Sequence, residues 1–176
     1  MACGLTTGHP GQFDSAIRLY RTTLGARERV QGPQHPDVMT TRQNLADSYL
    51  ADGRLKNALS AHKRVLADRE RILGPDHLDT IAARGSLAAA YHAAGRMASA
   101  VQYYEQTRGG YERALGADRP DTLARCASLA HAYYAVGRVT DAMMLLRDTL
   151  ARCERVLPPG DPLTDSVRQS LTNIAG

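Results

Sequence analysis

The sequence has 176 residues, of which 43% are hydrophobic and 23% charged, a composition typical of folded soluble chains and unlike that of disordered ones. Its net charge of +4 comes from 22 Lys and Arg interleaved with 18 Asp and Glu, which argues against a basic nucleic-acid surface. No apolar run is long enough to span a membrane, and residues 1–12 lack the pattern of a signal peptide. The three cysteines are widely spaced, which disfavours a disulfide framework or zinc site and fits a cytoplasmic protein.

A period of 42 residues runs through the chain. It is carried by an alanine, a tyrosine, a glycine followed by arginine, a leucine and a glutamate, each recurring at this step. These residues are Ala16, Ala58, Ala100 and Ala142; Tyr49, Tyr91 and Tyr133; Gly53, Gly95 and Gly137; Leu45, Leu87, Leu129 and Leu171; and Glu28, Glu70, Glu112 and Glu154. A period of this length indicates an array whose units bury their apolar faces on their neighbours.

Each period contains two helical patterns. Residues 55–73 carry small and apolar residues at a 3.6-residue spacing, and Gly74 with Pro75 ends that pattern. A second pattern follows and ends before Gly95. Extended along the chain, these patterns predict eight helices, over residues 12–30, 36–52, 55–73, 78–94, 97–115, 120–136, 139–157 and 162–175, with a poorly ordered stub at residues 1–10. The predicted fold class is an all-α solenoid of antiparallel helical hairpins.

The pattern Leu45-Ala46-x-x-Tyr49-x-x-x-Gly53-x-x-x-x-Ala58 resembles the signature of the tetratricopeptide repeat, and it recurs from Leu87 and from Leu129. The ordinary repeat of that family has 34 residues. The longer step found here, with its connectors GPQHPDV and GPDHLDT, is similar to that of the kinesin light chain subclass. The resemblance covers residues 11–176. It implies a right-handed superhelix that acts as a non-enzymatic protein-interaction module and binds no cofactor.

In tetratricopeptide arrays, the first helix of each hairpin lines a concave groove that binds a peptide or partner protein. The resemblance implies that the groove positions here are Thr40, Gln43, Asn44, Asp47 and Leu50; Gly85, Ser86, Ala89 and His92; and Ala127, Ser128, His131 and Tyr134. The chain departs from the family pattern at Arg42, Arg84 and Cys126, where a large apolar residue is usual. Binding of the subclass's cargo motifs is therefore not inferred.

Two other functions fit the same sequence. The array begins with a second helix, which fits the sensor part of a larger signalling system working with an NTPase. The first and last helices lack obvious polar caps, so self-association through the ends of the array is a further hypothesis, giving a self-assembling scaffold.

Two connectors repeat a His-x-Asp sequence, at His35 with Asp37 and at His77 with Asp79. Such pairs could bind a metal or act as an acid and a base. Because a catalytic site needs one geometry and not a copy in each repeat, N-capping of the following helix is the favoured interpretation. Nucleotide-binding and hydrolase motifs are absent, and Cys126 lies on an apolar stripe, so no catalytic residue or metal site is expected.

The repeated glutamates lie in runs such as Arg27-Glu28-Arg29, which could form an anion-binding ladder or pair with arginines of the following helix. The expected pairs are Glu28 with Arg42, Glu70 with Arg84, and Glu112 with Arg125. A separate irregularity, Gly109-Gly110 inside a predicted helix, is interpreted either as tolerated sequence drift or as a kink.

Overall fold

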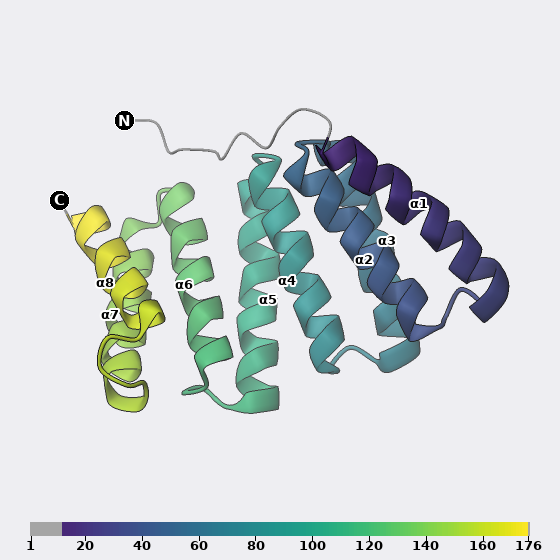
Figure 1. The fold of residues 1–176 in the computed structure, drawn as a ribbon. Helices are drawn as coiled ribbons and strands as arrows, with labels where there is room; N and C mark the ends of the chain where they lie inside the picture. The colour runs from purple at the N-terminus through teal and green to yellow at the C-terminus, as the bar shows by residue number, and fades with distance from the viewer. Residues whose placement is uncertain (1–11, 176) are drawn as a thin grey trace. The chain divides into compact units, whose positions relative to one another are not determined.

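The computed structural model describes residues 12–175 and forms an all-α solenoid of eight helices there, with no strand among those residues (Figure 1). The helices are α1 (Gln12–Gln31), α2 (Pro36–Ala51), α3 (Leu55–Leu73), α4 (Leu78–Ala93), α5 (Met97–Leu115), α6 (Pro120–Ala135), α7 (Val139–Val156) and α8 (Pro162–Ala175). Every predicted helix is confirmed, close to its expected bounds. The stub predicted for residues 1–10 lies outside the described residues.

The chain divides into two compact units at Ile72 and Leu73. The N-terminal unit contains α1, α2 and nearly all of α3, and the C-terminal unit contains α4 to α8. Within the C-terminal unit, each helix packs against the next one along the chain, and α6 also contacts α8 (Figure 1).

The first helix of a hairpin begins at a histidine cap in two of the repeats. The Nδ1 atoms of His35 and His77 accept hydrogen bonds from the backbone N–H groups of Asp37 and Asp79, each at 3.2 Å. These bonds satisfy N–H groups that the first helical turn leaves without a partner. The capping interpretation is therefore confirmed. Arg119, the equivalent residue before α6, makes no side-chain cap bond.

The first helices end at glycines with a left-handed backbone. Gly95 has φ +69°, and after it the N–H of Arg96 donates to the carbonyl oxygen of Tyr91 at 2.9 Å, which closes the helix end. Gly53 and Gly137 have φ values of +71° and +80° at the same step. Because residues with a Cβ rarely adopt this backbone, the repeated glycine fixes the tight turn within each hairpin.

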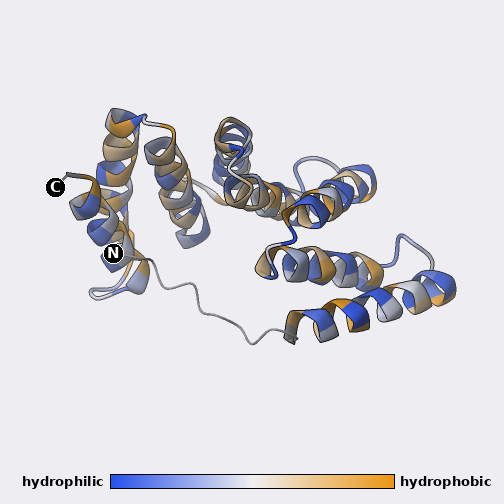
Figure 2. Ribbon diagram, turned by 90° about the horizontal axis from the view of Figure 1, so that it is seen from above, coloured by the Kyte–Doolittle hydropathy of each residue, from blue (hydrophilic) through white to orange (hydrophobic). Residues whose placement is uncertain are grey.

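The core is built from the periodic leucines and alanines. Hydrophobic and hydrophilic residues alternate along each helix (Figure 2), as expected for amphipathic helices that share an interior. Ala58, Ala100 and Ala142 are fully buried, as are Leu87 and Leu129. The small alanine side chain lets neighbouring helix backbones approach closely, which explains why the repeat retains it.

The paired glycines of α5 have different environments. The helix runs through both of them without interruption. A Cβ added at Gly109 would meet only the end of Arg113, at 3.5 Å, whereas one added at Gly110 would lie 2.8 Å from Cγ2 of the buried Ile81 in α4. No packing contact requires glycine at position 109, so tolerated sequence drift explains Gly109. Gly110 is required by close packing of α4 on α5, a cause that neither sequence interpretation included.

Candidate interaction surface

The predicted groove residues of the N-terminal unit lie on α2, and two of them, Gln43 and Asp47, are hydrogen-bonded to each other. The hydroxyl of Thr40 donates to the carbonyl oxygen of Pro36 at 3.0 Å, and Nε2 of Gln43 donates to the Asp47 carboxylate at 3.0 and 3.2 Å. Asp47 is exposed, while Asn44 and Leu50 are half-buried. This face of α2 therefore offers a carboxylate beside an amide and an apolar side chain.

A buried histidine lies behind this face. His62 of α3 is 1% exposed, and its Nε2 lies 3.6 Å from Oδ1 of Asp47. Burial lowers the pKa of His62, and the nearby Asp47 opposes that shift only in part. His62 belongs to no sequence motif, and its equivalents at the 42-residue step are Tyr20, Tyr104 and Leu146. A titratable residue at a position otherwise occupied by tyrosine or leucine was the available signal.

His62 should make the stability of the chain depend on pH. Because its folded pKa is lowered below the ordinary value of 6.5, the unfolded chain takes up a proton that the folded chain resists. The stability that neutral His62 contributes to the folded chain is fully present above about pH 6.5 and is lost as the pH falls below that value. We expect the midpoint temperature of thermal unfolding to be lower at pH 5.5 than at pH 7.5. The difference between the two pH values should be smaller in His62→Leu than in the wild type.

The control is His77→Asn, which replaces an exposed capping histidine with another good cap and should keep the wild-type slope. Circular dichroism at the two pH values measures both variants. Equal slopes in His62→Leu and wild type would contradict the assignment of this pH dependence to His62.

A row of polar side chains crosses the first helices of the C-terminal unit. Nε2 of His131 in α6 lies 2.9 Å from the Ser170 hydroxyl in α8, a hydrogen bond between the two helices. Desolvation lowers the pKa of His131, and its electrostatic interaction with His92 in α4 lowers it further. Tyr134 follows His131 by almost one helical turn and is 49% exposed. The polar row, His92, His131 and Ser170, therefore lies beside an accessible aromatic ring.

Ser170 was not among the predicted groove residues. The three members of the polar row are each 39 residues apart, three fewer than the repeat step. Residues that meet across stacked helices follow a diagonal and not an exact repeat position, so an alignment at 42 residues does not identify this partner.

The other predicted groove residues of this unit are small. Ser86 and Ala89 of α4 and Ser128 of α6 are half-buried. Ala127 packs against the core formed by Ala130, Leu146 and Val167. Gly85 is buried, and a Cβ there would lie 3.2 Å from Cγ2 of Thr107 in α5. Gly85 therefore packs within the α4–α5 hairpin, and its place in the groove stays a prediction.

The predicted glutamate–arginine pairing is confirmed in the first repeat. Glu28 Oε1 lies 2.5 Å from Arg42 Nη2, and Arg42, only 4% exposed, also binds Asp68 of α3. The equivalent residues at the last step, Glu154 and Arg168, pair at 2.9 Å. The pair Glu70–Arg84 stays a prediction. The expected pair of Glu112 with Arg125 is wrong, because these two described residues form no ion pair and the Arg125 guanidinium lies over the Tyr111 ring, 5.4 Å from its centroid. The observed pairs connect consecutive helices, as a role in fixing their register requires.

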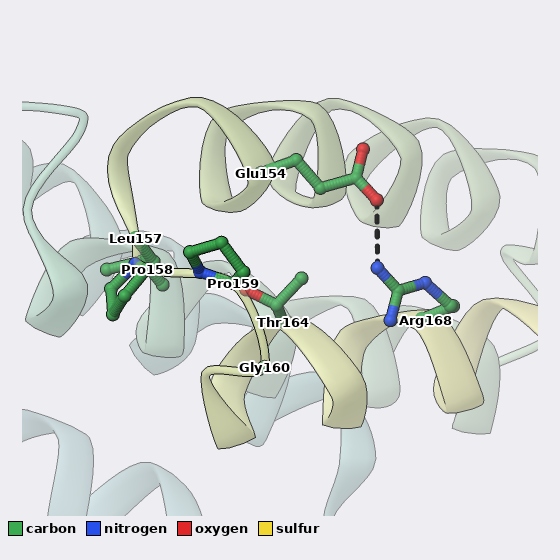
Figure 3. Close-up of a pocket in the computed structure, with 7 residues that line it drawn as sticks. All are labelled: Glu154, Leu157, Pro158, Pro159, Gly160, Thr164 and Arg168. Carbon is green, nitrogen blue, oxygen red and sulfur yellow. Dashed lines mark hydrogen bonds and ion pairs between the residues drawn. The ribbon is translucent and has the colours of Figure 1, made fainter.

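The Glu154–Arg168 pair borders a cavity of about 350 Å³ at the loop between α7 and α8 (Figure 3). Its lining residues are Glu154, Leu157, Pro158, Pro159, Gly160, Thr164 and Arg168. Because Arg168 also binds Asp165 at 2.7 Å, its charge is already neutralised by two carboxylates. The arrangement is a loop closed by an ion pair.

Residues 12–175 contain no group of three or more His, Cys, Asp or Glu placed to hold a metal ion, and none of their helices is long and apolar enough to cross a membrane. Cys126 is 4% exposed, and burial raises the pKa of its thiol, partly opposed by Arg108. A buried thiol with a raised pKa is a poor nucleophile, so the interpretation of Cys126 as a core residue is confirmed.

Comparisons with known proteins agree with this architecture. One tetratricopeptide repeat model matches residues 8–71 and 44–113, and a second matches residues 122–163. No curated protein sequence matches the chain significantly. A Podosopora anserina structure with nearly identical TPR-like repeats of the kinesin light chain type has a TM-score of 0.82 and 27% identity. The match covers 93% of this chain and 78% of that one.

A point variant of that protein has a TM-score of 0.83 and 27% identity, over 93% of this chain and 77% of the variant. BtubC (BKLC) from P. vanneervenii shares the fold with a TM-score of 0.81 at 22% identity, over 93% and 65% of the two chains. The two family models together cover most of the sequence, in agreement with the helical hairpins and their periodic glycines and alanines. The chain therefore belongs to the tetratricopeptide repeat family and resembles the repeats of kinesin light chains.

Proposed function

We propose that the chain is a protein-interaction module that binds a segment of a partner protein on the first helices of its repeats. Tetratricopeptide repeats are in general protein-interaction modules. The observation that carries the proposal is the polar row of His92, His131 and Ser170 beside the exposed ring of Tyr134. Such a surface combines hydrogen-bonding groups with an accessible aromatic anchor.

These side chains have distinct roles in the proposed complex. A half-exposed tyrosine supplies a large apolar area together with a hydroxyl, and tyrosines are frequent binding hot spots. The imidazoles of His92 and His131 supply hydrogen bonds to the backbone or side chains of an extended or helical segment. The small Ser86, Ala89 and Ser128 leave space for the partner's side chains.

The test is affinity capture from a native cell lysate, read by mass spectrometry. The binding variant carries His92→Ala, His131→Ala and Tyr134→Ala. A matched control carries Gln102→Ala, Gln106→Ala and Arg147→Ala, three exposed positions on the second helices α5 and α7. We expect a partner that the wild type and the control retain, and whose capture by the binding variant falls at least about tenfold, the loss of about 1.4 kcal/mol.

Both variants must first show the helix content and unfolding midpoint of the wild type. Equal capture by the binding variant and the wild type would contradict the proposed surface. The α2 face is tested separately with Asn44→Ala and Leu50→Ala, because it lies in the other unit. Recovery of the chain itself as the sole captured protein would favour the self-assembling scaffold.

A further inference from the structure

One arginine occupies a core position of the repeat. The residue at this step is leucine in the other three copies, Leu24, Leu66 and Leu150, and arginine at Arg108 in α5. Leu66 is buried, and Leu150 packs against the hydrophobic core of the C-terminal unit. Arg108 is itself half-buried. A charge at such a position costs stability unless it is compensated.

The compensation is missing within the described part of the chain. Nε of Arg108 is buried without a hydrogen-bond partner, and the guanidinium forms no ion pair with any described carboxylate. The buried Arg42, by contrast, binds both Glu28 and Asp68. Arg152 in α7 occupies the repeat position that Asp68 has in α3, so a cation stands there in place of a carboxylate. Arg152 binds Asp148 at 3.1 Å.

The charge of Arg108 acts on the groups around it. It lowers the pKa of the Cys126 thiol against the larger effect of burial, and the weaker influence of Arg152 has the same sign. Glu112 acts on the same thiol in the opposite direction, and its influence is weaker still. Of the charged groups that act on this thiol, Arg108 therefore has the largest effect.

Arg108 lines an open crevice of about 310 Å³ formed by α5, α6 and α7. The crevice is lined by Arg108, Leu129, Tyr133, Arg138, Asp141, Met144 and Leu145. Met144 is 64% exposed and presents its apolar side chain to solvent beside Leu129 and Leu145. The crevice therefore combines an uncompensated cation with an accessible apolar wall.

The second arginine of the crevice is already paired. Nε of Arg138 lies 2.6 Å from the Asp141 carboxylate, its Nη1 lies 3.4 Å from Glu105, and its guanidinium stacks over the Tyr133 ring at 4.0 Å. The hydroxyl of Tyr133 donates to Glu105 at 2.8 Å. These contacts occupy Asp141, the carboxylate that lines the crevice, and the nearby Glu105, so Arg108 is the lining cation without a carboxylate partner.

We propose that this crevice binds a segment of a partner protein in which an Asp or Glu side chain adjoins an apolar side chain. The carboxylate pairs with Arg108, which supplies the counter-charge that the chain itself lacks. The apolar side chain packs on Leu129, Met144 and Leu145. Arginines at interfaces are frequent contributors to binding energy, because the guanidinium can pair with a carboxylate through two hydrogen bonds.

This site is separate from the surface under "Proposed function". Leu129 and Tyr133 are four residues apart and lie on one side of α6, while His131 and Tyr134 lie on another side, with His131 bonded to α8. The equivalent crevice of the N-terminal unit includes Leu24 in place of Arg108. Both of its arginines have carboxylate partners: Arg42 binds Glu28 and Asp68, and Arg64 lies 4.0 Å from Glu28. That crevice serves as an internal comparison.

The test is an NMR titration of the whole chain with N-acetyl-leucine, which presents a carboxylate beside an apolar side chain. N-acetyl-leucinamide, its uncharged analogue, is the matched probe. We expect saturable shifts of the Met144 methyl and Arg108 Nε–H signals with the acid, and shifts at least about tenfold smaller with the amide. The Met39 methyl in the N-terminal unit should not shift.

Three variants make the result specific. Arg108→Leu, which restores the residue of the other repeats, should lose the Met144 shift and unfold at a higher temperature than the wild type. Arg108→Gln, which keeps a polar side chain without the charge, should also lose it. Arg147→Leu, which removes an exposed arginine of α7, should retain it.

Equal shifts with the acid and the amide would overturn the proposal, as would a Met144 response that survives in Arg108→Leu and Arg108→Gln. A Met144 signal that changes with protein concentration in the absence of probe would identify a second copy of the chain as the occupant and overturn it too. None of these three results would bear on the His131 and Tyr134 surface, which the capture experiment tests.

Discussion

Replacing Arg42 with alanine is expected to lower the free energy of unfolding by about 3 kcal/mol, because the change removes the buried cation that Glu28 and Asp68 share. The two carboxylates keep only the exposed Arg64 and Arg71, at 4.0 and 3.6 Å. The side chain of Arg42 is 5% exposed, and those of Glu28 and Asp68 are 32% and 22% exposed. Glu28 belongs to α1 and Asp68 to α3, so one guanidinium on α2 holds both neighbouring helices. Urea denaturation followed by circular dichroism measures the loss.

Two further variants distinguish this explanation from a simple loss of side-chain volume. Arg168→Ala removes an arginine from the equivalent pair with Glu154, but that arginine is half-exposed, so a much smaller loss is expected. The triple variant Arg42→Met, Glu28→Gln, Asp68→Asn removes all three charges and should recover most of the stability. An Arg42→Ala variant that unfolds at the wild-type urea concentration would refute the role of the buried charge.

The helices were predictable because the determinants of their ends are local and repeated. A glycine that needs a positive φ, such as Gly95, and a cap such as His77 act through backbone geometry within a few residues. The fully buried Ala100 and Leu87 recur at the same step, so each repeat confirms the assignment of the others. Agreement between periodicity and turn residues left no alternative to helical hairpins.

Contacts between helices were less predictable. Glu28 and Arg42 follow a repeated spacing, and their pairing was inferred correctly, but the second partner Asp68 has no periodic signal. The residues at its step are Ala26, Asp68, Gly110 and Arg152. The side chain at this position thus differs in chemistry from one repeat to the next. Which residue occupies it depends on how closely the neighbouring helices approach each other.

The candidate surface shows the same limit. Family resemblance selected His131 and Tyr134, which the structure places beside the polar row, but it also selected Gly85, which is buried against Thr107. Ser170 was missed because it meets His131 across a diagonal of the stack. A repeat alignment identifies the helix that contributes a surface, whereas the side-chain partners depend on the offset between neighbouring helices.

The packing of α4 on α5 leads to the second large effect: Gly110→Ala should destabilise the chain by about 1–2 kcal/mol, although alanine favours helix over glycine by about 1 kcal/mol. The new Cβ would lie 2.8, 3.0 and 3.2 Å from three side-chain carbons of Ile81. Ile81 is 1% exposed and β-branched, so it has little freedom to move away. The overpacking therefore outweighs the gain in helix propensity.

The neighbouring glycine is the matched control. Gly109→Ala meets only the flexible end of Arg113, so it should stabilise the chain by about 0.5–1 kcal/mol through helix propensity alone. The same helix thus carries two identical substitutions, one residue apart, with opposite expected signs. Adding Ile81→Val, which removes one of the contacting carbons, should reduce the cost of Gly110→Ala in a double-mutant cycle. If both alanine variants raised the unfolding midpoint equally, close packing at Gly110 would be excluded as the reason for the glycine, and drift would account for both positions.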